Sequence, residues 1–395
     1  MSLLSERLAQ YDAPQKAKAL GVYPYFRAIS SDQDTEVIID GKPVLMFGSN
    51  SYLGLTNHPR IKEGAIKATE KYGTGCAGSR FLNGTLDIHL ELEERLAKLV
   101  GKEEAMVYPT GFTVNSGVIP CLGGREDYLL LDRLNHASII EGSRVSMAKQ
   151  FKYKHNNMEE LERFLQMCDP DKIKVIATDG VFSMEGDVCK LPEMVALAKK
   201  YNASIYVDEA HSLGFFGENG AGVCEHFGLQ NDVELVMGTF SKSLATIGGF
   251  VASNKDVINF LRHNSRTFIF SASITPAATG AVLAALDVMA EEKWRPKQLW
   301  ANTHRMIDAF KKEGFEIGHT TTPIIPLFIR DNEKTFRITR MLMDDGVFVN
   351  PVVSPAVPSE DTLIRISLMA THTFEQIDEA VAKITKNAKL LGVLQ

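Results

Sequence analysis

Short apolar runs alternate with longer amphipathic runs along most of this 395-residue chain, and this pattern limits the choice of fold. Apolar runs of strand length, separated by helical segments, predict parallel strands joined by helices. We expect strands at residues 105–108, 128–131, 175–178, 205–207, 235–237 and 250–252, and further strands at 324–329 and 363–368. The predicted fold is α/β, with a mostly parallel, mixed sheet between helices.

The division into domains follows from chain length and from a change in composition near residue 280. A chain of this length with 45% hydrophobic residues can bury a large core and favours a major and a minor domain. Pro276 lies near the start of a predicted helix, and the chain becomes more polar after it. We predict an N-terminal segment at 1–45, a large domain at 46–280 and a smaller α+β domain at 281–395.

Lys242 follows the predicted strand at 235–237 and is flanked by hydroxyl side chains, including Thr239 and Ser241, that can bind phosphate. A solvated surface lysine is the common alternative. A lysine that is partly desolvated and close to other cations becomes an amine nucleophile toward carbonyl groups. Pyridoxal phosphate (PLP) requires this chemistry, so Lys242 is the expected Schiff-base lysine.

Asp208 ends the predicted strand at 205–207, at the edge where open α/β sheets bind ligands. Facing a pyridine nitrogen, its carboxylate would keep the ring protonated and electron-withdrawing. His211 could then reach the phenolic oxygen of the ring. Taken alone, Asp208 could instead cap the following helix.

Two motifs point to other ligands. Residues 208–211, Asp-Glu-Ala-His, resemble the magnesium-binding box of some helicases, but the chain contains no Gly-x-x-x-x-Gly-Lys-Ser/Thr phosphate loop. Residues 73–78 match the dinucleotide fingerprint, but residues 61–72 before them have helical periodicity where a strand is required. We predict a glycine-rich loop there, followed by polar residues that can line a site.

Further loops contain residues suited to a planar, phosphorylated ligand. Gly111 and Phe112 open a predicted helix whose amides and dipole could hold phosphate, although an ordinary strand-to-helix turn is the alternative. His136 could stack on the ring, or be a solvated loop histidine, and Ser183 could donate to the ring oxygen. Arg365 could clamp a substrate carboxylate, or serve in a structural ion pair.

Charge and cysteine content exclude several classes of protein. The 43 basic and 49 acidic side chains give a net charge of −6, without a basic cluster that could follow a nucleic-acid backbone. Five separated cysteines fit neither a disulfide framework nor a zinc site and favour a reducing cytoplasm. No secretory signal is apparent, and residues 274–290 are too short and polar to span a bilayer. We expect a cytoplasmic protein with no metal site and no nucleic-acid partner.

In order along the chain, these motifs resemble the α-oxoamine synthase family of fold type I PLP enzymes, which condense an amino acid with an acyl-CoA thioester. The resemblance is found at residues 50–55, 73–85, 110–112, 135–138, 179–184, 208–212, 239–242 and 370–373. The run 344–358 is most similar to bacterial members that use L-serine and palmitoyl-CoA. Other members make aminolevulinate, 8-amino-7-oxononanoate or 2-amino-3-ketobutyrate with the same catalytic set. Some relatives have tyrosine at Phe112, which changes one side-chain contact.

The resemblance implies a role for each residue of the motifs. Lys242 anchors PLP and then acts as the base, Asp208 holds the ring nitrogen, and His136 stacks on the ring. Asn50 and Arg365 bind the substrate, with Arg365 on the serine carboxylate. The implied reaction is a decarboxylating condensation of L-serine with a long-chain acyl-CoA to 3-ketodihydrosphingosine, the first step of sphingolipid synthesis.

The resemblance also implies a homodimer with shared active sites, in which Ser271 and Ser273 contact the phosphate bound to the neighbouring chain. A long acyl substrate implies an apolar channel and loose contact with the inner face of the membrane. An alternative of another class is a catalytically silent partner subunit on the same fold. Such proteins often lack the lysine, whereas this chain contains Lys242.

Overall fold

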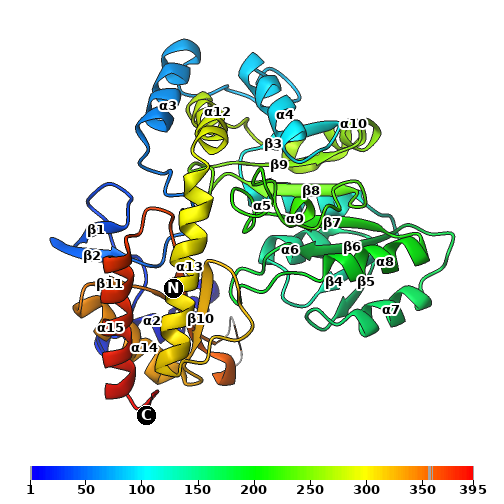
Figure 1. Cartoon of the computed structure of the whole chain (residues 1–395). Coiled ribbons are helices and arrows are strands. Elements are labelled where there is room, and N and C mark those ends of the chain that lie inside the picture. Colours follow the sequence, from blue (N-terminus) through cyan, green and yellow to red (C-terminus); the bar gives the residue numbers. More distant parts are fainter. Residues whose placement is uncertain (1, 355–356, 358, 395) are drawn as a thin grey trace. The chain divides into compact units, whose positions relative to one another are not determined.

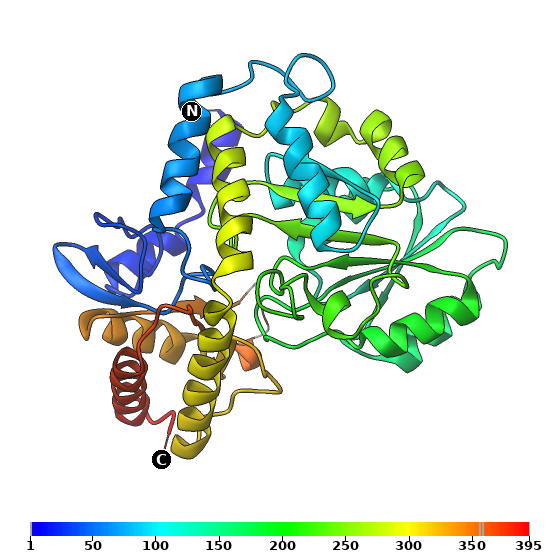
Figure 2. The same cartoon turned by 45° about the horizontal axis from the view of Figure 1, so that its top comes forward.

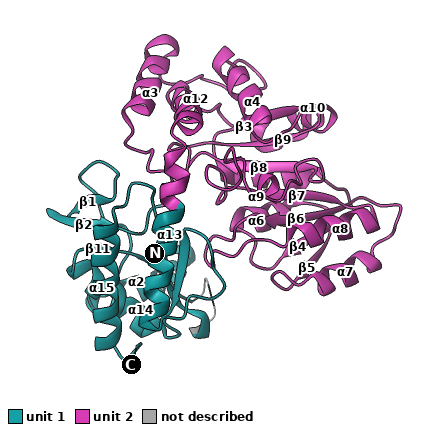
Figure 3. Cartoon of the chain, viewed as in Figure 1, with its two compact units in different colours: residues 1–49, 300–395 teal, residues 50–299 magenta. Residues whose placement is uncertain are grey.

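The computed structural model describes residues 2–354, 357 and 359–394, so residues 355, 356 and 358 of the run 344–358 lie outside the described residues. The chain forms two compact units, one of residues 50–299 and the other of residues 1–49 and 300–395 (Figure 3). The sequence places the boundary at 280/281, which falls inside the continuous helix α12 (Pro276–Glu291). Because α12 packs on α3 (Pro59–Tyr72), residues 281–299 stay with the larger unit.

Among the described residues, a seven-stranded mixed sheet forms the centre of the larger unit, in the order β3-β9-β8-β7-β6-β4-β5 (Figure 1). The strands are β3 Glu104–Tyr108, β4 Tyr128–Asp132, β5 Lys149–Tyr153, β6 Lys174–Asp179, β7 Ser204–Asp208, β8 Leu235–Thr239 and β9 Gly249–Ser253. Strands β8, β7, β6, β4 and β5 are parallel, and β9 pairs antiparallel with β8 and β3. The predicted mixed sheet is confirmed, and β5 is an additional strand.

Helices flank this sheet. They are α3, α4 Asp87–Leu99, α5 Gly111–Val118, α6 Ala137–Val145, α7 Met158–Met167, α8 Leu191–Tyr201, α9 Val223–His226, α10 Lys255–Asn264, α11 Arg266–Ile269 and α12, with a 3-10 turn at Ile119–Cys121. Helix α13 (Trp294–Glu313) begins in the larger unit and continues into the smaller one. Helix α5 packs on β3, β8 and β9, and α8 packs on β7. Helices α3 and α12 lie side by side (Figure 2), where a Cβ at Gly64 would lie only 2.7 Å from the Gly280 carbonyl oxygen.

The carboxyl ends of the parallel strands meet at one edge of the sheet. Every residue of β4, β6 and β8 is buried, as expected for strands covered on both faces. The last residues of four neighbouring strands are nevertheless polar and buried: Asp132, Asp179, Asp208 and Thr239. Buried polar groups are costly unless they are hydrogen-bonded, so this edge is the natural place for a site.

The smaller unit contains two three-stranded sheets in its described part. One is β1 Glu36–Ile39, β2 Lys42–Met46 and β11 Val347–Phe348; the other, antiparallel, is β10 Ile324–Phe328, β13 Leu363–Ser367 and β12 Asn350–Val352. Its helices are α1 Leu3–Ala9, α2 Ala13–Ala19, α14 Asn332–Asp344 and α15 Phe374–Leu390, with a 3-10 turn at Ser359–Asp361. The strands predicted at 324–329 and 363–368 are confirmed. No helix in the described part of either unit combines the length and the apolar character needed to cross a membrane.

Candidate active site

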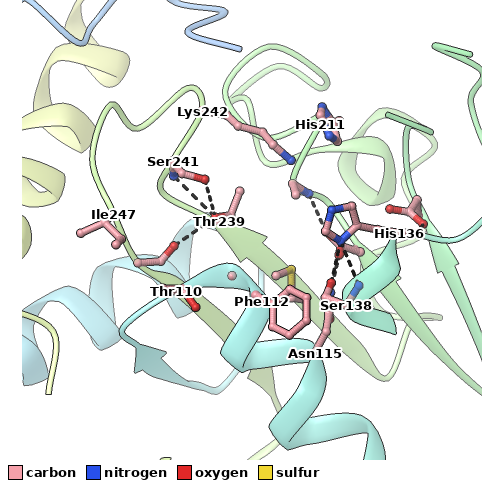
Figure 4. A pocket seen from close by; sticks show the side chains of 16 residues that line it. Thr110, Phe112, Asn115, His136, Ser138, His211, Thr239, Ser241, Lys242 and Ile247 are labelled. Carbon is pink, nitrogen blue, oxygen red and sulfur yellow. Dashed lines mark hydrogen bonds between the residues drawn. The ribbon is translucent and has the colours of Figure 1, made fainter. Parts of the chain in front are cut away.

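A cavity of about 340 Å³ lies at the carboxyl ends of the parallel strands, within the larger unit (Figure 4). Its volume is in the range of small-molecule sites. Eight predicted site residues from the described chain line it: Gly111, Phe112, His136, Asp208, His211, Thr239, Ser241 and Lys242. The other lining residues are Thr110, Asn115, Ser138, Asp179, Ala210, Met237, Ile247 and Gly248. The structure therefore brings together residues that are 131 positions apart, from Gly111 to Lys242.

One part of the cavity wall offers donors for an anion. Thr110 caps α5, because its Oγ1 accepts the Thr113 amide at 3.1 Å. The next amides, at Gly111 and Phe112, have no partner inside a helix and lie at the positive end of its dipole. A Cβ on Gly111 would lie 2.7 Å from Thr239 Oγ1, so only glycine fits here without a shift. Ser241 Oγ lies 3.0 Å from the same Thr239 oxygen.

Lys242 lies on the connection between β8 and β9, as predicted. Backbone hydrogen bonds close this connection, with the Phe240 amide donating to the Gly248 carbonyl at 2.9 Å and the Thr246 amide donating to the Phe240 carbonyl at 3.0 Å. Phe240 and Leu244 are fully buried on either side of Lys242. The half-buried lysine therefore extends into the cavity from a well-anchored loop.

Asp208 is held by two hydrogen-bond donors. Its Oδ2 accepts a hydrogen bond from Asn115 Nδ2 at 2.7 Å, and its Oδ1 accepts the Ala210 amide at 2.9 Å. Donors of this kind stabilise the ionised form of an acid. Asp179 differs, because burial, and then the charge of Asp208, raise its pKa well above the usual range. Asp179 also accepts the His136 amide at 2.9 Å.

The two histidines of the cavity are each held by a hydroxyl group. His136 Nδ1 lies 2.7 Å from Ser138 Oγ, and loss of surrounding water lowers the pKa of His136, so the ring is neutral at neutral pH. Tyr52 hydroxyl lies 2.6 Å from His211 Nδ1, and Tyr52 itself is fully buried. Both imidazoles therefore have a fixed partner on the protein side of the cavity.

Five predicted site residues of the described chain lie outside the cavity lining. Asn50 Oδ1 accepts the Tyr52 hydroxyl at 3.5 Å, and Ser183 lies in the loop that follows β6. Ser273 Oγ donates to the Gly84 carbonyl at 2.8 Å. Arg365 is buried on β13 of the smaller unit, where its Nη1 donates to Ser367 Oγ at 2.6 Å.

The sequence interpretation did not assign a role to Asn115, Ser138, Asp179, Tyr52 or Tyr206. Tyr52, Ser138 and Asp179 lie inside motifs that it did single out, and Tyr206 lies in a predicted strand. A buried asparagine in helix α5 is the signal that could have identified Asn115.

Comparisons with known proteins agree with this geometry. The model of the aminotransferase class I and II family matches residues 42–384. Serine palmitoyltransferase of Bacteroides thetaiotaomicron is 59% identical over 394 residues, covering 100% of both chains. 8-Amino-7-oxononanoate synthase of Thermoanaerobacter pseudethanolicus is 41% identical over 381 residues, covering 96% of both. A solved structure of SPT with PLP as an internal aldimine superposes with a TM-score of 0.96 at 35% identity, covering 100% of both chains.

These matches span nearly the whole chain, and the solved structure shares its fold. The chain belongs to the aminotransferase class I and II family of fold type I enzymes and, within it, to the α-oxoamine synthases.

Proposed function

We propose that this chain is a serine palmitoyltransferase that uses PLP to condense L-serine with palmitoyl-CoA, releasing CO₂ and CoA. The observation that supports this most strongly is that Lys242 and Asp208 line one cavity that also contains anion donors. The choice of serine and a long acyl chain rests on the greater identity to the serine palmitoyltransferase than to the 8-amino-7-oxononanoate synthase.

The residues present fit PLP. The amides that begin α5, together with the hydroxyls of Thr239 and Ser241, offer the donors that a phosphate needs. Asp208 provides a buried carboxylate for the pyridine nitrogen, and Lys242 provides an amine for the aldehyde. Each chemical feature of the cofactor therefore has a matching group in the cavity.

When bound, PLP supplies an electrophilic aldehyde and a protonated ring that stabilises negative charge on the neighbouring carbon. Asp208 would hold the proton on the ring nitrogen, because its carboxylate is fixed by two donors. Lys242 Nζ takes the Cα proton of serine and later returns a proton to the same carbon. His136, neutral and beside Asp179, limits the freedom of the ring by stacking on it.

Substrate binding and assembly are parts of the same proposal. Arg365 holds the serine carboxylate, and Asn50 and His136 contribute substrate contacts. Ser183 and His211 donate to the ring oxygen, and Ser271 and Ser273 reach the phosphate in the neighbouring subunit of a homodimer. The enzyme works in the cytoplasm, in loose contact with the inner face of the membrane where its acyl substrate and product partition.

A substrate matrix tests this function. L-serine, glycine, L-alanine and L-threonine are each combined with acetyl-CoA and palmitoyl-CoA, and thiol release is followed together with CO₂. We expect the highest kcat/KM for L-serine with palmitoyl-CoA. A preference for glycine or alanine would assign another α-oxoamine synthase reaction, such as that of 8-amino-7-oxononanoate synthase or 2-amino-3-ketobutyrate CoA ligase. No turnover with any pair, by a PLP-loaded protein, would favour a silent partner subunit.

A further inference from the structure

Asn115 lies at the branch point of a buried hydrogen-bond network under the cavity (Figure 4). Its Nδ2 donates to Asp208 Oδ2 at 2.7 Å and to Ser138 Oγ at 2.8 Å. Tyr206 hydroxyl donates to Asn115 Oδ1. Asn115 and Tyr206 are fully buried, so these hydrogen bonds are shielded from competing water.

The direction of each hydrogen bond in this network is fixed. If the amide of Asn115 were turned over, its oxygen would face the Asp208 carboxylate, and two acceptors would be opposed. Ser138 Oγ accepts from Asn115, so its own proton is available for His136 Nδ1, 2.7 Å away. The Ser138 amide also donates to Nδ1, at 3.3 Å. Because Nδ1 accepts twice, the single proton of the neutral imidazole lies on Nε2.

We propose that Asn115 is a positioning residue that fixes both the Asp208 carboxylate and, through Ser138, the Nε2–H tautomer of His136. One amide group thus aligns the acid assigned to the ring nitrogen and the imidazole assigned to the ring face. This inference deepens the proposed function and rests on it for the identity of the cofactor. The hydrogen bonds of this network join protein groups only, so they do not depend on the cofactor.

Nitrogen-15 NMR of histidine-labelled protein without cofactor measures the tautomer directly, and His136→Gln assigns the signal. We expect wild type to show an unprotonated Nδ1 and a protonated Nε2 at neutral pH. In Asn115→Leu, Ser138 Oγ becomes free to accept from the ring, so the two tautomers should mix. Ser138→Ala removes the hydroxyl but leaves the backbone amide that donates to Nδ1, so it should keep the wild-type tautomer, as should Ser116→Ala, a neighbour whose Oγ donates to the Phe112 carbonyl.

The loaded enzyme provides a second readout. Loss of one hydrogen bond to a charged group predicts a roughly 10- to 100-fold lower kcat in Asn115→Leu, with a smaller change in the KM for serine. Tyr206→Phe keeps the shape of the core and should give a milder effect of the same kind. An unchanged tautomer in Asn115→Leu would overturn the inference, even if that variant lost activity. Failure of wild type to use serine would instead contradict the proposed function and leave the tautomer result standing.

Discussion

Asp179 and Asp208 lie directly opposite each other in the register of β6 and β7, and the structure surrounds them differently. Burial and the charge of Asp208 raise the pKa of Asp179 well above its usual range, whereas Asp208 accepts hydrogen bonds from the Asn115 side chain and the Ala210 amide. Two acids at neighbouring strand ends therefore form a matched pair for mutagenesis.

We expect Asp179→Asn to keep most of the activity, because a neutral acid and an amide are similar and the amide oxygen can still accept the His136 amide. Asp208→Asn should lower kcat by about 10²- to 10³-fold, since it removes the charge that keeps the cofactor ring protonated. Steady-state kinetics and the absorption spectrum of bound PLP measure both effects. Equal losses in the two variants would show that the charge is not localised on Asp208.

The close approach of Gly111 to Thr239 predicts how the phosphate end responds to one added methyl group. In Gly111→Ala the new Cβ would meet Thr239 Oγ1 at 2.7 Å, and the loop must shift. Overpacking of this kind costs about 1–3 kcal/mol, so the Kd for PLP should rise by roughly 10-fold or more. Titration of the apoprotein with PLP measures this Kd. Gly124→Ala, where the nearest atom would be 3.6 Å away, is the control, and an equal Kd in both variants would contradict the assignment.

His155 predicts a pH-dependent contribution to stability near the Ser183 loop. Burial disfavours the charged form of His155. Hydrogen bonds and charges from Asp132, 3.1 Å from Nδ1, and Asp187, 3.3 Å from Nε2, outweigh this effect and raise the pKa of His155 to about 9. Glu185 also faces this group. Because the folded pKa lies above the unfolded value of about 6.5, the stabilisation is complete below pH 6.5 and is lost as the pH rises through 9.

Urea unfolding of His155→Gln tests this expectation. The variant should be less stable than wild type by on the order of 3 kcal/mol at pH 6, and the difference should shrink above pH 9. His263→Gln, which removes an exposed histidine, serves as the control. A difference that stays constant from pH 6 to pH 10 would mean that His155 is not charged in the folded protein.

Apolar pattern alone predicted the central strands, because strands covered on both faces are continuous apolar runs. Strand β5 has the sequence Lys-Gln-Phe-Lys-Tyr and lies at an edge with most side chains exposed, so it lacks that signal. The domain boundary was placed at a change in composition, but the packing of α12 on α3 decides it, and that contact joins distant segments.

The site was predictable where a residue ends or follows a strand, as Asp208 ends β7 and Lys242 follows β8. Asn115 could not be given a role in the same way, because its partners come from two other elements, Tyr206 and Asp208 from β7 and Ser138 from α6, that only tertiary packing brings together. Local pattern identifies the ends of strands, and tertiary packing determines which of them share a hydrogen bond.

Covalent attachment of the cofactor aldehyde to Lys242 is the central claim, and borohydride trapping measures it most directly. The protein is incubated with PLP, reduced, digested and analysed by peptide mass spectrometry, alongside Lys242→Ala and the control Lys255→Ala on α10. We expect one pyridoxyl phosphate group on the peptide that contains Lys242, in wild type and Lys255→Ala, and none at this position in Lys242→Ala. Labelling of wild type at another lysine, with Lys242 unmodified, would contradict the account.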